Sequence, residues 1–204
     1  MTSAFGSRPD QDAASLMPVL WTDCEPARLL RDQREVRAFA PLLEFHTPSP
    51  DGWPHGGWTG LLPRWPFTRP QPQALDELLG KDELEVAVYY SAAYPMVPPT
   101  IHARFPAPTL EEETQSAWHV APGGALCLLQ SDAGWHPEAS LTDLLAKACG
   151  WRIEYALMKA AVIDKMSVHG IVSDASHDHL IEQAVQYLPA LQTPSREDAP
   201  DAKR

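Results

Sequence analysis

The sequence predicts an α+β fold, in which helices pack on an antiparallel sheet of about four strands. Segments with strand character follow one another between a helical segment near the N-terminus and helical segments near the C-terminus. The clearest strand, 84–90, alternates apolar residues with Glu85, Ala87 and Tyr89, a pattern typical of a half-buried strand. Strands grouped apart from helices favour α+β over alternating βαβ units.

Composition narrows the classes of function. The 204 residues suit one domain with extensions, and the net charge of −11 argues against nucleic acid as the main partner, because phosphate binding needs a basic surface. The three cysteines, Cys24, Cys127 and Cys149, are too few and too scattered for a disulfide scaffold, which suggests a reducing compartment. Residues 1–12 lack the apolar core of a signal peptide, and no apolar run approaches the roughly 20 residues that span a bilayer. We therefore expect a cytoplasmic protein with no membrane partner.

The chain is expected to divide into three parts. Residues 1–20 form a flexible lead-in, residues 21–188 form one folded domain, and residues 189–204 form a polar, proline-bearing, disordered tail. Many of the 21 prolines fall in the segments between expected elements, where they stiffen the chain and forbid helix.

A first helix is expected to begin near Thr22 or Asp23, to carry Pro26 in its first turn and to end at about Ala40. Its arginines recur at every third residue, at Arg28, Arg31, Arg34 and Arg37. We expect them to share one broad helical face. That face is either the solvated side of a packed helix or a basic docking surface on an otherwise acidic protein.

The middle of the chain predicts short strands separated by irregular segments. Residues 42–46 and 100–105 are expected to be strands, and 48–58, rich in Pro, Gly and Trp, a loop or hairpin. Residues 59–73 carry four prolines, so they cannot form a regular helix. We expect an edge strand with irregular breaks there, because proline is tolerated at the edge of a sheet. Residues 75–79 suit one helical turn.

The C-terminal part predicts helices. Residues 105–115 read as a loop with an acidic trio. Ser140 and Asp143 have capping-box spacing at the start of a long apolar stripe, and Gly150 is a candidate for a bend or a break in that helix. Residues 176–188 predict a last amphipathic helix opened by a serine cap.

One short segment carries the candidate chemistry. Cys127 follows the pair Gly123 and Gly124, which permits a tight approach of the backbone, and the flanking Leu126 and Leu128 are expected to anchor a short extended segment. Two interpretations stand side by side. The thiol is either a buried free cysteine, which is a common state, or an accessible nucleophile.

The histidines do not by themselves complete a catalytic group. His119 and His136 lie near Cys127 in the sequence, but no Cys-His-Asp protease grouping is evident. The histidines and cysteines also lack the paired spacing of a zinc site, so we expect no metal.

Three motifs in order resemble those of ubiquitin-conjugating enzymes. The chain has Tyr-Pro, two residues and Pro-Pro at 94–99, and Gly, two residues and Cys-Leu at 124–128. Trp135 lies eight residues after the cysteine, and Pro137 follows. The segment 84–145 is therefore similar to the core of that family.

The resemblance implies a ubiquitin-conjugating-enzyme-like fold for the folded domain, with an N-terminal helix, the sheet and C-terminal helices. It implies that Cys127 accepts a ubiquitin-like protein from an activating enzyme as a thioester and transfers it to a lysine amine of a protein substrate. No cofactor is implied, since ATP is used by the activating enzyme. The first helix would dock that enzyme through Arg28, Arg31, Arg34 and Arg37.

The chain departs from the family in ways that define further alternatives. The family usually has His-Pro-Asn upstream of the cysteine, whereas this chain has His119 at the offset of the asparagine. His119 would stabilise the oxyanion, act as a base for the incoming lysine or brace the loop. In this divergence, the chain is similar to bacterial members of the family, which are encoded in operons tied to antiphage defence. Two other hypotheses stand beside the enzyme. The protein is either a catalytically inactive module that has the same fold and binds ubiquitin-like proteins, or an unrelated cysteine hydrolase.

Overall fold

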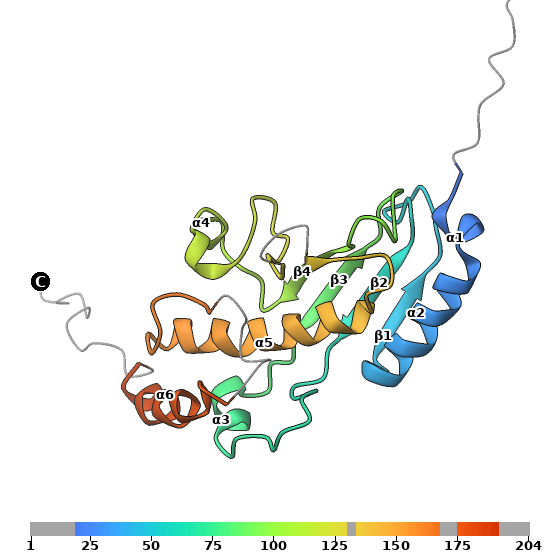
Figure 1. Cartoon of the computed structure of the whole chain (residues 1–204). Helices are drawn as coiled ribbons and strands as arrows, with labels where there is room; N and C mark the ends of the chain where they lie inside the picture. Colours follow the sequence, from blue (N-terminus) through green and yellow to red (C-terminus); the bar gives the residue numbers. More distant parts are fainter. Residues whose placement is uncertain (1–18, 130–133, 168–174, 192–204) are drawn as a thin grey trace, which may run out of the picture.

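A computed structural model describes residues 19–129, 134–167 and 175–191 of the chain. They form an α+β fold around a four-stranded antiparallel sheet with the strand order β1-β2-β3-β4 (Figure 1). The strands are β1 (Leu43–His46), β2 (Gly57–Leu61), β3 (Glu85–Tyr89) and β4 (Thr100–Phe105). The helices are α1 (Trp21–Cys24), α2 (Pro26–Phe39), α3 (Leu75–Leu79), α4 (Leu110–Glu113), α5 (Leu141–Lys159) and α6 (Asp178–Leu191), with a 3₁₀ turn η1 (Ser116–Trp118).

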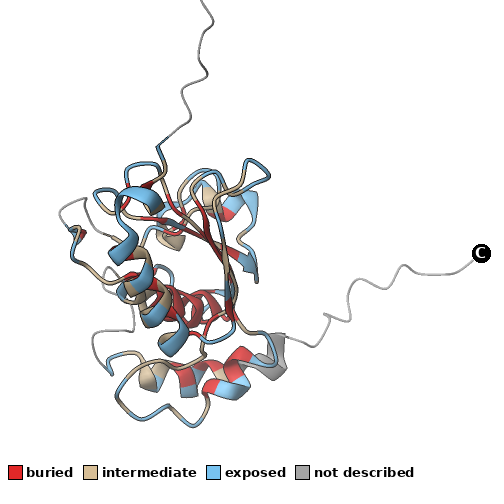
Figure 2. Cartoon of the chain, turned by 90° about the vertical axis from the view of Figure 1, so that its right-hand side faces the viewer, coloured by how far each residue is buried: buried red, intermediate tan, exposed pale blue. Residues whose placement is uncertain are grey.

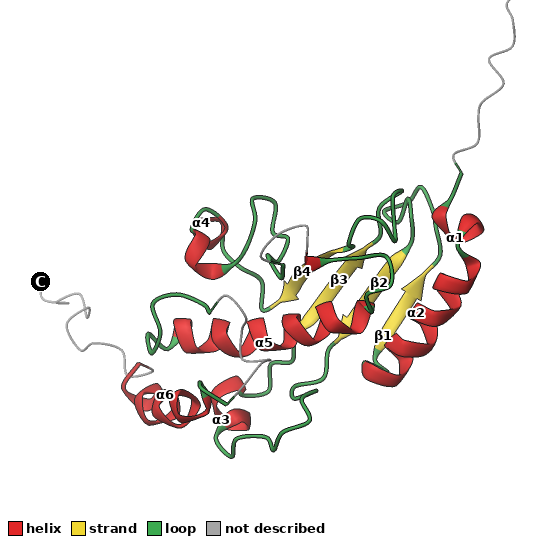
Figure 3. Ribbon diagram, in the orientation of Figure 1, coloured by secondary structure: helices red, strands yellow, loops and turns green. Residues whose placement is uncertain are grey.

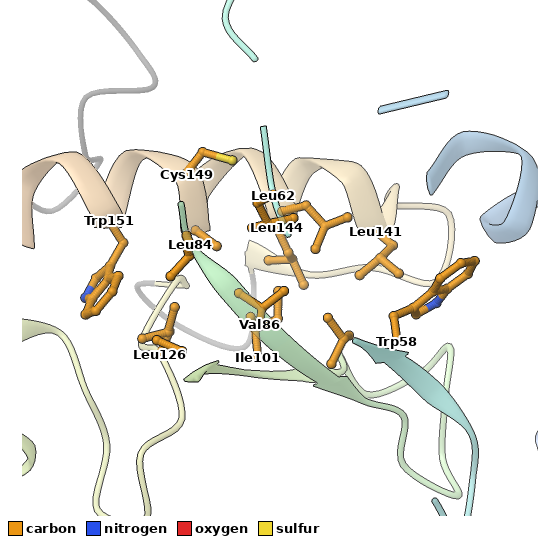
Figure 4. Close-up of a cluster of buried hydrophobic side chains, with 14 of the residues drawn as sticks. Trp58, Leu62, Leu84, Val86, Ile101, Leu126, Leu141, Leu144, Cys149 and Trp151 are labelled. Carbon is orange, nitrogen blue, oxygen red and sulfur yellow. The ribbon is translucent and has the colours of Figure 1, made fainter. Parts of the chain in front are cut away.

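The elements lie in layers. The strands, yellow in Figure 3, form one layer; α5 runs across it, and α2 lies beside β1. Helix α5 is buried along most of its length (Figure 2) because it packs on both of its sides. One side faces the sheet: in Figure 4, Val86 and Ile101 of neighbouring strands lie beneath Leu141 and Leu144 of α5. The cysteine-bearing loop adds Leu126 to the same core.

The opposite side of α5 forms a second apolar cluster. Ile153 and Leu157 of α5 pack with Leu75 of α3 and Ile181 of α6, and all four side chains are fully buried. Helices α3 and α6 are therefore held against α5 rather than against the sheet.

The predicted first helix is two helices. Glu25 has a non-helical backbone, as expected of a residue before proline, and Pro26 has no N–H to continue the hydrogen bonds of α1. The expected start at Thr22 or Asp23 was therefore wrong. Helix α2 begins at Pro26 and ends next to Ala40, where its end was predicted.

The strands at 42–46, 84–90 and 100–105 and the helical turn at 75–79 are confirmed within a residue at each end. The predicted edge strand at 59–73 is wrong. Its first residues belong to β2, which lies inside the sheet and ends at Leu61, so all four prolines fall in the connection that follows. An interior strand needs its N–H groups, which proline cannot supply.

The predicted loop at 105–115 contains the short helix α4. Its start is a complete capping box, in which Thr109 and Glu112 each accept a hydrogen bond from the other's backbone N–H. Helix α5 is continuous through Gly150, and Ser140 caps it by accepting from the N–H of Thr142.

Helix α6 extends past its predicted end at 188: it reaches Leu191 and so continues through Pro189. Residues 1–18 of the expected lead-in and 192–204 of the expected tail lie outside the described residues. Within the described ranges, no helix combines the length and apolar character needed to cross a bilayer.

Candidate active site

The backbone before the cysteine folds into a tight turn. The N–H of Gly124 donates to the carbonyl of Ala121 over 2.9 Å, and the N–H of Ala121 donates to the carbonyl of Ala125 over 2.8 Å. Gly123 and Gly124 have φ angles of 92° and 83°, which a side chain would strain. The predicted role of the glycine pair is therefore confirmed.

Hydrogen bonds on both sides fix the cysteine in place. The N–H of Leu126 donates to the carbonyl of Ile101 on the edge strand β4, and the N–H of Cys127 donates to the carbonyl of His119, both over 2.8 Å. Leu126 is buried in the core, whereas Cys127 is exposed. The core thus anchors one residue and presents the thiol of the next, which excludes the reading of Cys127 as a buried cysteine. Of the other two cysteines, Cys149 is buried on α5 and Cys24 is exposed at the end of α1.

Cys127 and His119 line the same pocket. Its volume is about 760 Å³, and it opens between the cysteine turn and the segment that follows α4. Its wall is formed by Glu113, Thr114, Ser116, His119, Val120, Ala121, Pro122, Cys127 and Leu129. Cys127, His119 and Glu113 therefore lie around one mostly apolar hollow.

His119 has a left-handed backbone, with φ 49° and ψ 45°. Few side chains adopt this conformation, and His and Asn are enriched among those that do. The preceding turn fixes it, since the N–H of His119 donates to the carbonyl of Ser116 over 3.2 Å. The carbonyl of Trp118 accepts from Trp151 of α5 over 2.9 Å, which ties this turn to the core. The position thus suits histidine or asparagine.

Within the described part of the chain, the thiol of Cys127 has no imidazole partner. Among the described residues, no hydrogen bond joins the sulfur of Cys127 to a histidine ring, and His119 contacts Cys127 through its backbone carbonyl. Partial burial of the sulfur raises the pKa of the Cys127 thiol above its ordinary value, although the residue as a whole is exposed. A cysteine hydrolase pairs its thiol with a neighbouring base, and since the described residues show no such pair, the site gives that interpretation no support. His136, the other nearby histidine in the sequence, is exposed and is not among the residues that line the pocket.

The distant motifs meet in space. The indole N–H of Trp135 donates to the carbonyl of Pro95 over 2.8 Å, and the rings of Trp135 and Tyr94 lie 6.2 Å apart. The carbonyl of Pro137 accepts from Arg28 over 2.5 Å. The Tyr-Pro turn, the segment after the cysteine and α2 are therefore joined at one place.

The prediction that four arginines share one face of the first helix is wrong. Successive residues are 100° apart on a helix, so a step of three residues drifts steadily around it. Arg28 points inward and is only 7% exposed, while Arg34 and Arg37 are exposed. Arg31 lies between these extremes: it pairs with Glu35 and donates to the carbonyl of Glu138.

Arg28 is the centre of a buried polar cluster. It pairs with Asp32 over 2.9 Å, donates to the hydroxyl of Tyr94 and reaches the carbonyls of Pro137 and Ala139. The hydroxyls of Tyr90 and Tyr94 both donate to Asp32. Burial raises the pKa of Asp32, and the hydrogen bond from Tyr94 and the charge of Arg28 offset this only in part. Arg28 therefore links α2 to the segment after the cysteine and is not free to bind a partner.

Sequence reasoning missed Glu113. The sequence predicts a loop for the acidic trio at 111–113, whereas in the fold the trio lies on α4 and Glu113 lines the pocket. Its carboxylate accepts from the N–H of Gly123 over 3.3 Å. Among the described residues, no three His, Cys, Asp or Glu side chains are grouped in a way that would hold a metal ion.

Comparisons with known proteins add no relative. No family model, no curated protein and no solved structure matches this chain.

Proposed function

We propose that this protein is a ubiquitin-conjugating enzyme with a ubiquitin-conjugating-enzyme-like fold. Cys127 accepts a ubiquitin-like protein from an activating enzyme as a thioester and passes it to a lysine of a protein substrate. The pathway is a bacterial one, by resemblance an antiphage defence pathway, and it operates in the cytoplasm. ATP is used by the activating enzyme, and this chain needs no cofactor.

The observation that carries the proposal is the exposed thiol of Cys127, which the Gly-Gly turn holds on a fixed backbone at a pocket. The other two motifs contact each other, since Trp135 donates a hydrogen bond to the carbonyl of Pro95 across the fold. Access and a fixed backbone are what a thioester-forming cysteine needs.

The raised pKa of the Cys127 thiol is compatible with thioester transfer. The carbonyl that arrives from an activating enzyme is already part of a thioester. Attack on this carbonyl by the thiol of Cys127 therefore does not require a strongly activated nucleophile. A thiolate of higher pKa is also a poorer leaving group, as in thiol exchange generally. The bound modifier would therefore persist until an amine enters the pocket.

The exposed arginines at the end of the series are the candidates for docking the activating enzyme. Arg34 and Arg37 remain available for an activating enzyme, whereas Arg28 is used inside the fold. Charge across such an interface mainly raises the association rate.

The test is a loading reaction with a ubiquitin-like protein, its activating enzyme and ATP. The expected product is an adduct that dithiothreitol cleaves, and it should be lost in Cys127→Ala and retained in Cys24→Ala, a matched control at the other exposed cysteine. Cys127→Ser should give an ester that resists the thiol. Binding of the modifier without any adduct would support the inactive module instead, and an undiminished adduct on Cys127→Ala would refute the assignment of the cysteine.

A further inference from the structure

We propose that Arg64 and Arg152 form a binding site for one small anion, of the size of chloride. Both residues line a small cavity beside α5. Among the described residues, this cavity and the cysteine pocket have no lining residue in common, so the inference does not depend on the proposed function of Cys127.

The cavity lies where three segments of the chain meet. The connection after β2 contributes Arg64, the connection between α3 and β3 contributes Asp82, and α5 contributes Arg152. The apolar part of its wall comes from both apolar clusters and includes Leu62, Leu79, Leu84 and Cys149. Charges in such surroundings interact more strongly than they do in open water.

Arg152 is buried without a counter-ion. It is only 8% exposed, and within the described residues its one hydrogen bond runs from Nη2 to the carbonyl of Asp82 over a long 3.5 Å. Its Nε has no partner there, and no described carboxylate forms an ion pair with it. Arg28, which is 7% exposed, instead pairs with Asp32 and donates to a hydroxyl and two carbonyls. A guanidinium stays charged when buried, so Arg152 needs a source of negative charge.

Arg64 brings a second positive charge to the same cavity. It pairs with Asp76 over 3.0 Å and donates to the carbonyl of Gly80 at the end of α3. The pair is open to solvent, since the side chain of Asp76 is 66% exposed. The Nε of Arg64 is buried and, like that of Arg152, has no partner among the described residues. Two guanidinium N–H donors at one cavity are therefore left to be satisfied.

The acidic groups near the cavity do not compensate this charge. Asp82 and Glu83 also line it, but Asp82 is exposed, and in the described part of the chain neither forms an ion pair with the two arginines. Burial lowers the pKa of Arg152 and the charge of Arg64 lowers it further, whereas Asp82 and Tyr155 offset this only in part. An anion in the cavity would accept charge-assisted hydrogen bonds from the Nε–H groups and reduce the repulsion between the two guanidiniums.

The size of the cavity selects the kind of anion. Its volume is about 10 Å³, which is close to the minimum that holds one water-sized particle. Phosphate, sulfate and carboxylate ligands need much more space, so a single-atom anion is the ligand that fits. Water also fits, but it would leave the charge of the arginines uncompensated.

The first experiment measures thermal unfolding at constant pH and ionic strength while sodium chloride replaces sodium gluconate, an anion too large for the cavity. An ion that binds only the folded protein shifts the unfolding equilibrium about 100-fold when it is present at about 100 times its Kd. Arg152→Met removes the charge and the donors but keeps an apolar stem. Lys81→Met is the matched control, because it removes a positive charge next to Asp82 at an exposed residue that does not line the cavity.

The second experiment uses crystals of the parent protein grown with sodium bromide, since bromide can replace chloride and scatters anomalously. It does not depend on whether Arg152→Met folds.

The parent protein and Lys81→Met should have a higher Tm in chloride than in gluconate, and Arg152→Met should lose this difference. Bromide should give an anomalous peak within hydrogen-bonding reach of Nε of Arg64 and Arg152. An equal chloride effect in a folded Arg152→Met protein would overturn the inference, as would a water without anomalous signal at this place. A bromide peak without any chloride dependence of the parent Tm would mean an adventitious ion only and would also overturn it.

Discussion

At the scale of single residues, the backbone arranges the site more than the side chains do. The N–H of Cys127 donates to the carbonyl of His119, so a backbone hydrogen bond holds together two residues that line one pocket. Each residue can therefore be altered with limited effect on the other, provided that the backbone keeps its shape.

The reactivity of Cys127 should rise with pH further than that of a free thiol. Burial raises the pKa of Cys127, so the thiolate fraction at neutral pH is smaller than in free cysteine and continues to grow at pH values where free cysteine is fully ionised. The rate of alkylation by iodoacetamide, followed site by site with mass spectrometry, measures this. A half-maximal rate at or below the pH found for free cysteine would contradict it. Cys149 should stay unlabelled in the folded protein, because it is only 2% exposed.

Substitutions of His119 separate its three suggested roles only if the left-handed backbone is preserved. Alanine there costs roughly 1–2 kcal/mol in backbone strain, whereas glycine and asparagine accept the conformation. If the imidazole stabilises the oxyanion, His119→Gly should load normally and discharge to lysine about 10²–10³ times more slowly, and His119→Asn should recover part of the rate. If it acts as a base, neither variant should discharge well.

The control for His119 is thermal stability. A bracing role predicts that His119→Gly loses stability and that loading and discharge fall together. Normal discharge by a stable His119→Gly protein would exclude both chemical roles of the imidazole.

At the scale of elements, α2 has two different sides. Its inward side carries Arg28 and Asp32, which join the helix to the segment after the cysteine, and its outward side carries Arg34 and Arg37. A spacing of three residues that looks uniform in the sequence thus divides between the interior and the solvent.

Mutations on the inward side of α2 should lower stability, whereas mutations on its outward side should change loading alone. Arg28→Ala leaves the fully buried Asp32 without its ion pair, and breaking such a pair costs about 3–5 kcal/mol of unfolding free energy, measured by urea denaturation. Reversing Arg34 and Arg37 to glutamate should leave the urea midpoint unchanged and slow loading by the activating enzyme, most strongly at low salt. Unchanged loading at low salt would show that these two arginines are only a solvated surface.

At the scale of the whole molecule, α5 joins two apolar clusters. The first holds the sheet and the cysteine loop, and the second holds α3 and α6. The pocket adjoins the first cluster through Val120, which belongs to that cluster, and Leu129, which packs against it, so the second cluster should support stability without shaping the site.

Ile181→Ala tests this division. The side chain is fully buried between α6 and its neighbours, so its truncation should lower the free energy of unfolding by about 2–5 kcal/mol in urea denaturation. Under conditions in which the variant is folded, Cys127 should be acylated by a small thioester, the mercaptoethanesulfonate thioester of acetyl-glycyl-glycine, at the same rate as in the parent protein. Gln183→Ala, at an exposed position on the same helix, is the control and should change neither quantity. A slower acylation in Ile181→Ala would show that the two clusters are coupled.

Several features of this protein follow from sequence patterns alone. The strands at 84–90 and 100–105, the helix after Ser140 and the glycine turn before Cys127 were all predictable. Each depends on local physics: alternation of apolar residues, a capping hydroxyl, or φ angles that only glycine accepts without strain.

Other features were decided by contacts between distant residues. Arg28 finds its carbonyl partners 109 and 111 residues away, and its inward direction depends on how α2 packs. Glu113 reaches Gly123 because the neighbouring Glu112 docks on α5. There Glu112 accepts from Lys159, which lies 47 residues further along the chain. No local pattern encodes such pairings, since they depend on which helix face the core buries. The sequence by itself therefore determined three of the strands, the long helix after Ser140 and the glycine turn, while the tertiary structure decided that the thiol of Cys127 is exposed and which charged groups hold the fold together.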